Sequence, residues 1–474
     1  MPNFYYKPMW EIKFPSKPSD PQLNFLAESM SKKKPFDDSK IPAGYTYLSQ
    51  FIAHDISNDS LNEVNIFGNA QSISEFENKH KPSFDLKTIY GLDALPDMRV
   101  LQINSNTLLK VGETIPRSRL PPFKNDLPRY DGDKKADIID KRNDENLTVA
   151  QMQVAFMRFH NAIVKFLGEP DTLDTFMKAR RIAIRHYQWI VLHDFLPRIV
   201  KKKVLDDVKK TGNKFYTPKD GDIYMPFEFA IGAYRAGHSM VKNVYNWNIR
   251  RCLNGDDFRA SVHELKQFTG SSCPNFECLD GDLKLRSGWV INWNWFFDIN
   301  NSIETDKVFF NFANKINTNI SSYLGSLSPK PREDFLRYIS LPAIDLYRSR
   351  YISLSTGQTI ADKIDSSMIL KPEDLKPLLP EVVKDIFSKE TPILFYFLAE
   401  AEINENGETL GNIGSRIVAE TFLELLKRSE YSIYGVDFPN EADFLGEKGE
   451  FGIPQMLSFI EKMEPGFINP VEHN

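Results

Sequence analysis

Two histidines lie where an imidazole could do chemistry. In the segment YLSQFIAHDIS, residues 45–55, His54 follows Gln50 by about one helical turn, so both side chains share one face of the expected helix. His238 ends a second helical segment, FEFAIGAYRAGHSM. An imidazole titrates near neutral pH, so it can move protons or bind a metal ion. A lone histidine on an apolar helix is more often a buried structural residue, and the surroundings must decide between these roles.

The residues before His238 are unusually small. They include Gly232, Ala233, Ala236 and Gly237. Each glycine costs a helix about 1 kcal/mol relative to alanine, so the stretch needs a structural reason. Small side chains let a large flat ligand pack against the helix, and they suit a closely packed second helix nearly as well.

Charged residues elsewhere could complete a site around these histidines. A histidine that binds a metal needs a hydrogen-bond acceptor for its second ring nitrogen. Asp345, in the segment LPAIDLYRSRYISLSTGQTIA, is a candidate acceptor, and Arg348 follows it by three residues. Arg142 lies in a polar loop just before an expected helix and supplies a permanent positive charge.

The elements that must position these residues are mainly helical. Apolar residues at three- and four-residue spacing predict helices at 147–167, 174–200, 225–245, 305–323, 332–350, 372–388 and 414–428. Strand signals are few, and the clearest covers 287–293. Four prolines and a charged run predict a long, solvated loop at about 104–146. No linker divides the chain, which indicates one large, mainly α domain.

The composition excludes several classes of partner. The 474 residues carry a net charge of -5, which argues against a nucleic-acid or anionic-membrane surface. The sequence contains no run of eighteen apolar residues, so we expect no membrane span. The first twenty residues lack the pattern of a secretory signal. Three cysteines, Cys252, Cys273 and Cys278, suit reduced thiols in the cytoplasm. The polar surroundings of His80, His263 and His473 predict that these side chains face solvent.

Five segments, taken in order, resemble successive motifs of the animal-type haem peroxidases, and the bacterial members of that family are the most similar. The segments are YLSQFIAHDI, KRNDENLTVAQMQVAFMRFHNAIV, FEFAIGAYRAGHSMV, LPAIDLYRSRYISLSTGQTIA and LGNIGSRIVAETFLELL. The resemblance implies a single helical domain over residues 1–474 with haem b between its central helices. It also implies an N-terminal extension at about 1–40 and an active-site loop at about 104–146.

On one haem face, the resemblance identifies His54 as the distal histidine, an acid and base. Gln50 corresponds to a glutamine that binds water or a small ligand, and Arg142 to the catalytic arginine. The family reduces hydrogen peroxide through a ferryl intermediate and then oxidises a small donor such as a halide or a phenol. A response to oxidative stress is the physiological role that this activity suggests.

On the other face, His238 corresponds to the haem-iron ligand, and Arg235 and Arg348 to arginines beside the haem propionates. Asp345 replaces the asparagine that the family usually carries there. An ionised acceptor should give the imidazole more imidazolate character and lower the reduction potential of the iron.

Two further family features are altered. Ala53 replaces an aspartate that can form an ester with the haem, whereas Glu145 matches a second ester-forming carboxylate, so one ester link is an open alternative.

A calcium site of the family corresponds to Asp55 and the loop 81–91, with Asp85 as its carboxylate. Lys81 and Lys87 stand where oxygen-bearing side chains are usual, and calcium needs six to eight oxygens. We therefore predict that calcium is absent and that Lys87 replaces it.

Two other activities remain open. A fatty-acid dioxygenase of the same superfamily would use a tyrosine three residues before the iron ligand, but that position is Arg235, and Tyr234 lies one residue earlier. A haem-holding sensor or scavenger with little turnover would not need the combination of Gln50, His54 and Arg142.

Overall fold

The computed structural model describes residues 4–10, 18–32, 37–58, 76–92, 97–116, 120–219, 221–249, 258–270, 279–325, 340–447 and 449–471. Its α-helices are α1 (Asp20–Met30), α2 (Gly44–Ile56), α3 (Lys87–Tyr90), α4 (Leu147–Leu167), α5 (Leu173–Trp189), α6 (Leu196–Ile199), α7 (Lys202–Thr211), α8 (Val262–Gln267), α9 (Ser302–Thr305), α10 (Leu341–Tyr351), α11 (Gly357–Asp365), α12 (Pro372–Leu375), α13 (Lys384–Phe387), α14 (Ile393–Glu405), α15 (Asn412–Lys427) and α16 (Ile453–Met463). Two π-helices, η5 (Ile190–Phe195) and η6 (Glu228–Ala233), and two 3-10 helices, η4 (Lys141–Asp144) and η7 (Tyr234–Met240), also shape the site.

The strands are short. They are β1 (Phe4–Lys7), β2 (Asp38–Pro42), β3 (Glu77–Asn78), β4 (Met225–Pro226), β5 (Val244–Asn246), β6 (Arg259–Ser261) and β7 (Phe312–Asn314). Strand β1 pairs antiparallel with β3 and parallel with β4, while β2–β7 and β5–β6 form antiparallel pairs. The expected mainly α fold is confirmed.

The helix predictions succeed where the apolar spacing is long and regular. Helix α4 has the predicted bounds 147–167, and α15 nearly matches 414–428. The prediction 174–200 corresponds to α5, η5 and α6 in one continuous run. Pro197 lies at the start of α6, and because proline donates no backbone hydrogen bond, the wider π turn before it accommodates the loss.

Other predictions are wrong because tertiary pairing or proline overrides the local pattern. Residues 305–323 hold β7, which pairs with β2, rather than a helix. The prediction 372–388 breaks into short turns at Pro377 and Pro380. The segment 287–293 forms 3-10 turns instead of a strand, and α10 begins at Leu341, with 332–339 outside the described residues.

The small residues before His238 serve close helix packing. A side chain at Gly232 would meet Ile393 and Phe397 of α14 at 2.8 Å, and one at Gly237 would meet the Ser49 hydroxyl of α2 at 3.5 Å. At Gly232, therefore, the neighbouring helix accounts for the missing side chain. The predicted helix 225–245 is itself divided into β4, η6 and η7.

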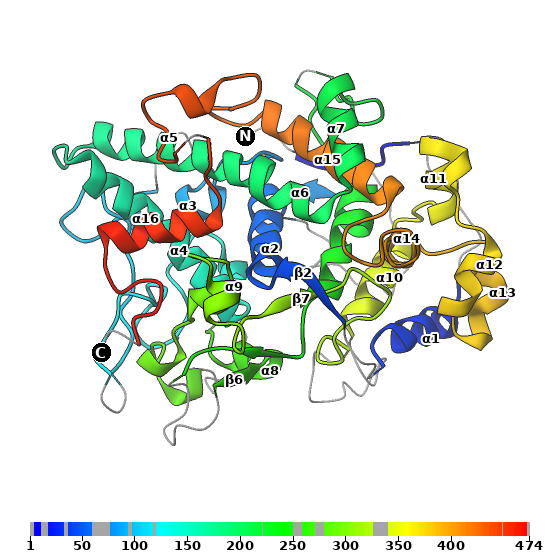
Figure 1. Ribbon diagram of the computed structural model, residues 1–474, viewed down its shortest axis with the longest axis horizontal. Coiled ribbons are helices and arrows are strands. Elements are labelled where there is room, and N and C mark those ends of the chain that lie inside the picture. The colour runs from blue at the N-terminus through cyan, green and yellow to red at the C-terminus, as the bar shows by residue number, and fades with distance from the viewer. Residues whose placement is uncertain are drawn as a thin grey trace.

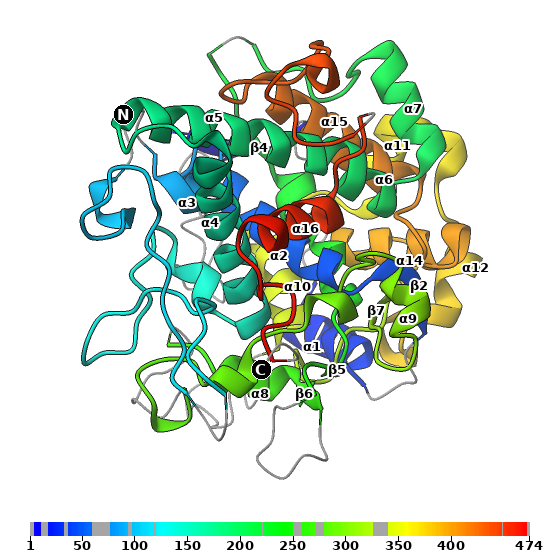
Figure 2. The same cartoon turned by 60° about the vertical axis from the view of Figure 1, so that its left-hand side comes forward.

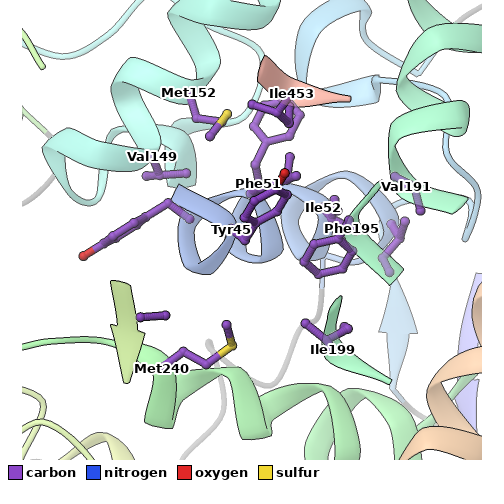
Figure 3. Packing of buried hydrophobic residues seen from close by; sticks show 14 of the residues in the cluster. Tyr45, Phe51, Ile52, Val149, Met152, Val191, Phe195, Ile199, Met240 and Ile453 are labelled. Atoms are coloured by element: carbon purple, nitrogen blue, oxygen red, sulfur yellow. The ribbon is translucent and has the colours of Figure 1, made fainter. Parts of the chain in front are cut away.

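Helix α2 runs through the middle of the molecule, between α4 and α5 on one side and α14 and α15 on the other (Figures 1 and 2). Its apolar side chains pack against α4 and η5, and Met240 of η7 lies on its other side (Figure 3). Phe51 stacks on Phe156 of α4 with ring centroids 4.6 Å apart. Each such buried aromatic side chain stabilises the fold by about 2–3 kcal/mol.

The loop 104–146 is irregular, as predicted, but much of it is not solvated. Arg129 lies buried between two buried carboxylates, with Nη1 2.9 Å from Asp144 Oδ2 and Nη2 3.2 Å from Asp126 Oδ1. Leu127 and Ala136 are also buried. The charged run therefore packs through internal ion pairs that its composition alone did not reveal.

The C-terminal end of α2 is fixed by the loop that leads into α3. Asp55 is fully buried and accepts backbone N–H groups from Leu86, Lys87 and Thr88. The Lys87 ammonium donates to the Ser83 carbonyl at 2.8 Å and lies 3.4 Å from Asp85 Oδ2. One lysine thus supplies positive charge to a pocket that contains two buried carboxylates.

Lys87→Met should destabilise the fold strongly. Removing one partner of a buried ion pair leaves an uncompensated charge, so we expect a loss of about 3 kcal/mol in the free energy of unfolding. Denaturant unfolding followed by circular dichroism measures it. Lys202→Met, which removes an exposed partner of Asp206, is the control and should cost under about 1 kcal/mol. Equal effects of the two substitutions would contradict the prediction.

Candidate active site

His54 lies near the end of α2 and is buried. Its Nδ1 atom is 2.7 Å from Oδ1 of Asn143, a residue of η4. Burial, together with the nearby charge of Arg142, lowers the pKa of His54 to about 4. The imidazole is therefore neutral over the whole physiological pH range, and a neutral imidazole can accept a proton.

Arg142 binds the C-terminal end of the helix that carries His54. Its Nη2 donates to the carbonyl oxygens of His54 and Ser57, both at 2.8 Å, and its Nε donates to Asp140 Oδ1 at 3.0 Å. A cation at this position satisfies carbonyls that the helix leaves without partners. Nη1 makes no hydrogen bond within the described part of the chain, and a fifth of the side chain is exposed.

His80 was predicted to face solvent, and this prediction is wrong. The ring is buried, with Nδ1 3.0 Å from the His54 carbonyl and 3.3 Å from the Asp55 carbonyl. Because carbonyl oxygens only accept, Nδ1 carries the proton, and Nε2 lies 4.0 Å from Asp140 Oδ2. Burial lowers the pKa of His80 to about 4. A second neutral histidine thus supports the backbone of His54.

His263 is exposed, as predicted. His473 and the three cysteines lie outside the described residues.

Gln50 lies among polar side chains from the start of α4. Its Nε2 is 3.4 Å from Glu145 Oε2, and Asn146 Nδ2 donates to its Oε1 at 3.0 Å. Asn146 also caps α4 by accepting the Val149 N–H. Glu145 is exposed, yet desolvation by surrounding protein raises its pKa. Gln50 therefore lies beside an exposed carboxylate at the start of α4.

The second histidine, His238, is hydrogen-bonded to a buried carboxylate. His238 Nδ1 is 2.8 Å from Asp345 Oδ2, and Arg235 Nη1 donates to Asp345 Oδ1 at 3.0 Å. Arg348 Nη1 lies 3.7 Å from the same oxygen. Burial alone would raise the pKa of Asp345, but the charge of Arg235, the hydrogen bond from His238 and the charge of Arg348 together hold the pKa below its ordinary value. Asp345 is therefore ionised.

The two histidines come from elements that touch. The Tyr234 hydroxyl of η7 donates to the Ser49 carbonyl of α2 at 3.1 Å, and Gly237 packs against the Ser49 side chain. Both Gln50 and His238 are adjacent to these contact residues in the chain. The structure thus brings the predicted residues into two groups, Gln50, His54, Arg142 and Glu145 on one side and Arg235, His238, Asp345 and Arg348 on the other.

The donor set of the second group fits a haem. Because Nδ1 of His238 faces a carboxylate, its Nε2 keeps the lone pair that an iron ligand needs, and 29% of the side chain is exposed. Arg235 and Arg348 supply guanidinium groups of the kind that bind carboxylates such as propionates.

Sequence reasoning missed Asn143, Gln153, His80 and Asp140. Asn143 directly follows Arg142 and Asp140 precedes it by two residues, so proximity to a candidate arginine was the available signal. His80 and Gln153 gave no such signal, because only the folded chain places them beside His54.

A sequence model of the animal haem peroxidase family matches residues 58–269. A peroxidase-like protein of Margaritifera margaritifera is 27% identical over 222 residues, 42% of this chain and 27% of that protein. The chorion peroxidase of Aedes aegypti is 29% identical over 128 residues, 25% of this chain and 16% of that protein. The chain thus matches less than a third of the length of either relative.

Solved structures share the whole fold at low identity. Peroxidase A from Dictyostelium discoideum superposes with a TM-score of 0.66 and 14% identity over 98% of this chain and 94% of that one. The fatty acid alpha-dioxygenase of Oryza sativa gives a TM-score of 0.58 and 15% identity over 95% and 77%. No described helix is long and apolar enough to cross a membrane. Residues 58–269 thus match the animal haem peroxidase family, and the chain has the fold of the solved peroxidase and dioxygenase structures.

Proposed function

We propose that the protein is a haem peroxidase that reduces hydrogen peroxide and oxidises a small donor. The observation that carries the proposal is the neutral, buried imidazole of His54 beside Arg142, on an element that contacts the one bearing His238. An acid and base next to a fixed positive charge is what cleavage of a peroxide bond requires.

His238 Nε2 would bind the iron of haem b, with Arg235 and Arg348 near its propionates. The bound haem would supply the site for peroxide and the electrons for its reduction. Asp345 orients the imidazole through Nδ1 and, being ionised, makes it a stronger donor. Glu145, whose side chain is exposed, is the residue that would form an ester with the haem.

On the other side, His54 would accept a proton from one peroxide oxygen and return it to the other. A positioned general base of this kind accelerates proton transfer by about 10²- to 10⁴-fold. Arg142 would stabilise the negative charge on the departing oxygen through Nη1, while Nε and Nη2 keep it in place. Gln50 would hydrogen-bond the incoming peroxide or water. A halide or a phenol would then serve as donor, and the enzyme would act in the response to oxidative stress.

We also propose that Lys87 takes the place of calcium beside Asp55 and Asp85. Burial raises the pKa of Asp85, but the Lys87 charge and the Ser83 hydrogen bond, together with Lys81 and the Glu430 N–H, hold that pKa below its ordinary value. The Lys87 ammonium already lies 3.4 Å from Asp85 Oδ2, and its charge also acts on Asp55, so EDTA should leave the unfolding midpoint of the wild-type protein unchanged. One tightly bound calcium per chain after EDTA treatment would contradict the proposal.

A fatty-acid dioxygenase is the second candidate, because solved dioxygenases share this fold and one of them is described with palmitic acid. Tyr234 is the nearest tyrosine in the chain, but its hydroxyl donates to the Ser49 carbonyl, and Arg235 occupies the position three residues before His238. Oxygen uptake with palmitic and linoleic acid distinguishes the two activities. A sensor or scavenger would bind haem and turn over neither substrate.

His54→Leu tests the proposed function directly. We expect the haem-loaded wild type to oxidise iodide or a phenol with peroxide, and the variant to lose about 10³-fold in kcat/KM for peroxide. Haem absorption should be unchanged, since His238 is intact. A wild type without turnover of bromide, iodide or phenol, or a variant as active as the wild type, would contradict the proposal.

The pH dependence follows from the lowered pKa of His54. Only the neutral imidazole accepts a proton, so the rate of reaction with peroxide should be constant from pH 8 to about 5 and fall as pH drops through about 4. Stopped-flow absorbance of the haem measures this rate. His263→Gln, at an exposed histidine, should leave the curve unchanged. An inflection near the ordinary histidine value of 6.5 would show that burial does not tune the group.

Asp345→Asn should raise the reduction potential of the iron. A neutral amide accepts the His238 N–H more weakly, so the imidazole loses imidazolate character. A spectroelectrochemical titration measures the potential, with Asp222→Asn at the exposed partner of Lys7 as control. If the wild-type potential is no lower than that of Asp345→Asn, the carboxylate does not act in this way.

A further inference from the structure

We propose that Asn143 and Gln153 fix the tautomer of His54, so that Nδ1 carries the proton and Nε2 is the proton acceptor. Both are positioning residues, since they act through His54. The consequence for catalysis rests on the proposed function, but the tautomer itself can be observed separately.

The direction of the hydrogen-bond chain is set by one backbone carbonyl. Gln153 Nε2 donates to the Thr88 carbonyl at 3.2 Å, and because a carbonyl only accepts, the amide nitrogen must face it. Gln153 Oε1 therefore points the other way and accepts from Asn143 Nδ2 at 2.7 Å. Asn143 Oδ1 is then the atom that faces His54 Nδ1 at 2.7 Å. An amide oxygen is an acceptor, so Nδ1 must be protonated.

Burial makes the alternative direction costly. The Asn143 side chain and Thr88 are fully buried, and only 2% of Gln153 is exposed. Turning both amides would place Gln153 Oε1 against the Thr88 carbonyl, two acceptors without a hydrogen between them. An unsatisfied buried polar group costs about 1–3 kcal/mol, which is enough to make one tautomer dominate.

The hydrogen-bond chain also links His54 to the turn that carries Arg142. Asn143 follows Arg142 directly, so one 3-10 turn supplies both the charge and the tautomer-fixing amide. The charged or titratable groups that face His54 are Arg142, Asp140 and His80. None of them bonds to Nδ1, which leaves Asn143 as the residue that determines where the imidazole proton lies.

The tautomer can be read from the ¹⁵N chemical shifts of the two ring nitrogens. Protein with ¹⁵N-labelled histidine is loaded with haem and placed in the diamagnetic ferrous–carbonyl form, and the His54 signals are assigned by their loss in His54→Gln. We expect a protonated Nδ1 and an unprotonated Nε2 in the wild type. Asn143→Leu and Gln153→Leu should move the population toward a protonated Nε2.

Two variants separate this role from a merely structural one. Asn143→Asp keeps an acceptor at Nδ1, so the tautomer should persist while the acid limb of the pH profile moves to higher pH. Gln151→Leu is the matched control, since Gln151 is equally buried on α4 and donates to a backbone carbonyl, that of Asn125. It should change neither the tautomer nor the pH profile.

Activity gives the second readout. Asn143→Leu and Gln153→Leu should lose about 100-fold in kcat/KM for peroxide, with the KM of the donor unchanged. A protonated Nε2 in the wild type, or a wild-type tautomer in folded Asn143→Leu, would overturn the inference. A wild type with protonated Nδ1 but no peroxide turnover would support the tautomer and contradict the proposed function.

Discussion

The site depends on how the C-terminal end of α2 is held inside the protein. Buried charges are costly unless each has a partner, and this helix end gathers several of them. Arg142 binds two carbonyls of the helix and the carboxylate of Asp140, while Asp55 accepts three backbone N–H groups from the loop before α3. His80 donates to the same helix end from a third direction. These polar contacts fix the backbone of His54 more specifically than apolar packing of the helix could.

The two histidines are tuned by different acceptors. His54 faces the neutral amide of Asn143, a weak acceptor, so burial dominates and the imidazole stays neutral. His238 faces the ionised carboxylate of Asp345, which two arginines keep charged. A neutral imidazole suits proton transfer, whereas an imidazole with a charged acceptor suits metal binding. The roles proposed for the two histidines therefore fit the chemistry of their partners.

Local sequence patterns predicted the long helices and the candidate site residues. Strand pairing and the partners of buried polar side chains depend on tertiary structure, which those patterns do not report. The spacing that predicts α4 is a property of 21 consecutive residues, so it could be read directly. The strand β7 depends on β2, which lies over 260 residues earlier, and a local pattern cannot report that pairing. His80 stands between two lysines in the sequence and nevertheless lies buried, because the carbonyls of α2 and Asp140 supply its polar partners. Gln153 lies on an apolar helix, where its function depends on an amide from a different element.

The loop before α3 connects the pocket of Lys87 with the tautomer of His54. The Lys87 ammonium contacts the Ser83 carbonyl and Asp85, and its backbone N–H donates to Asp55. The next residue, Thr88, contributes the carbonyl from which the amide chain to His54 begins. A movement of this loop would therefore disturb the end of α2 and the orientation of both amides together. Under the proposal that Lys87 replaces calcium, the proton position on His54 would not depend on the supply of an external cation.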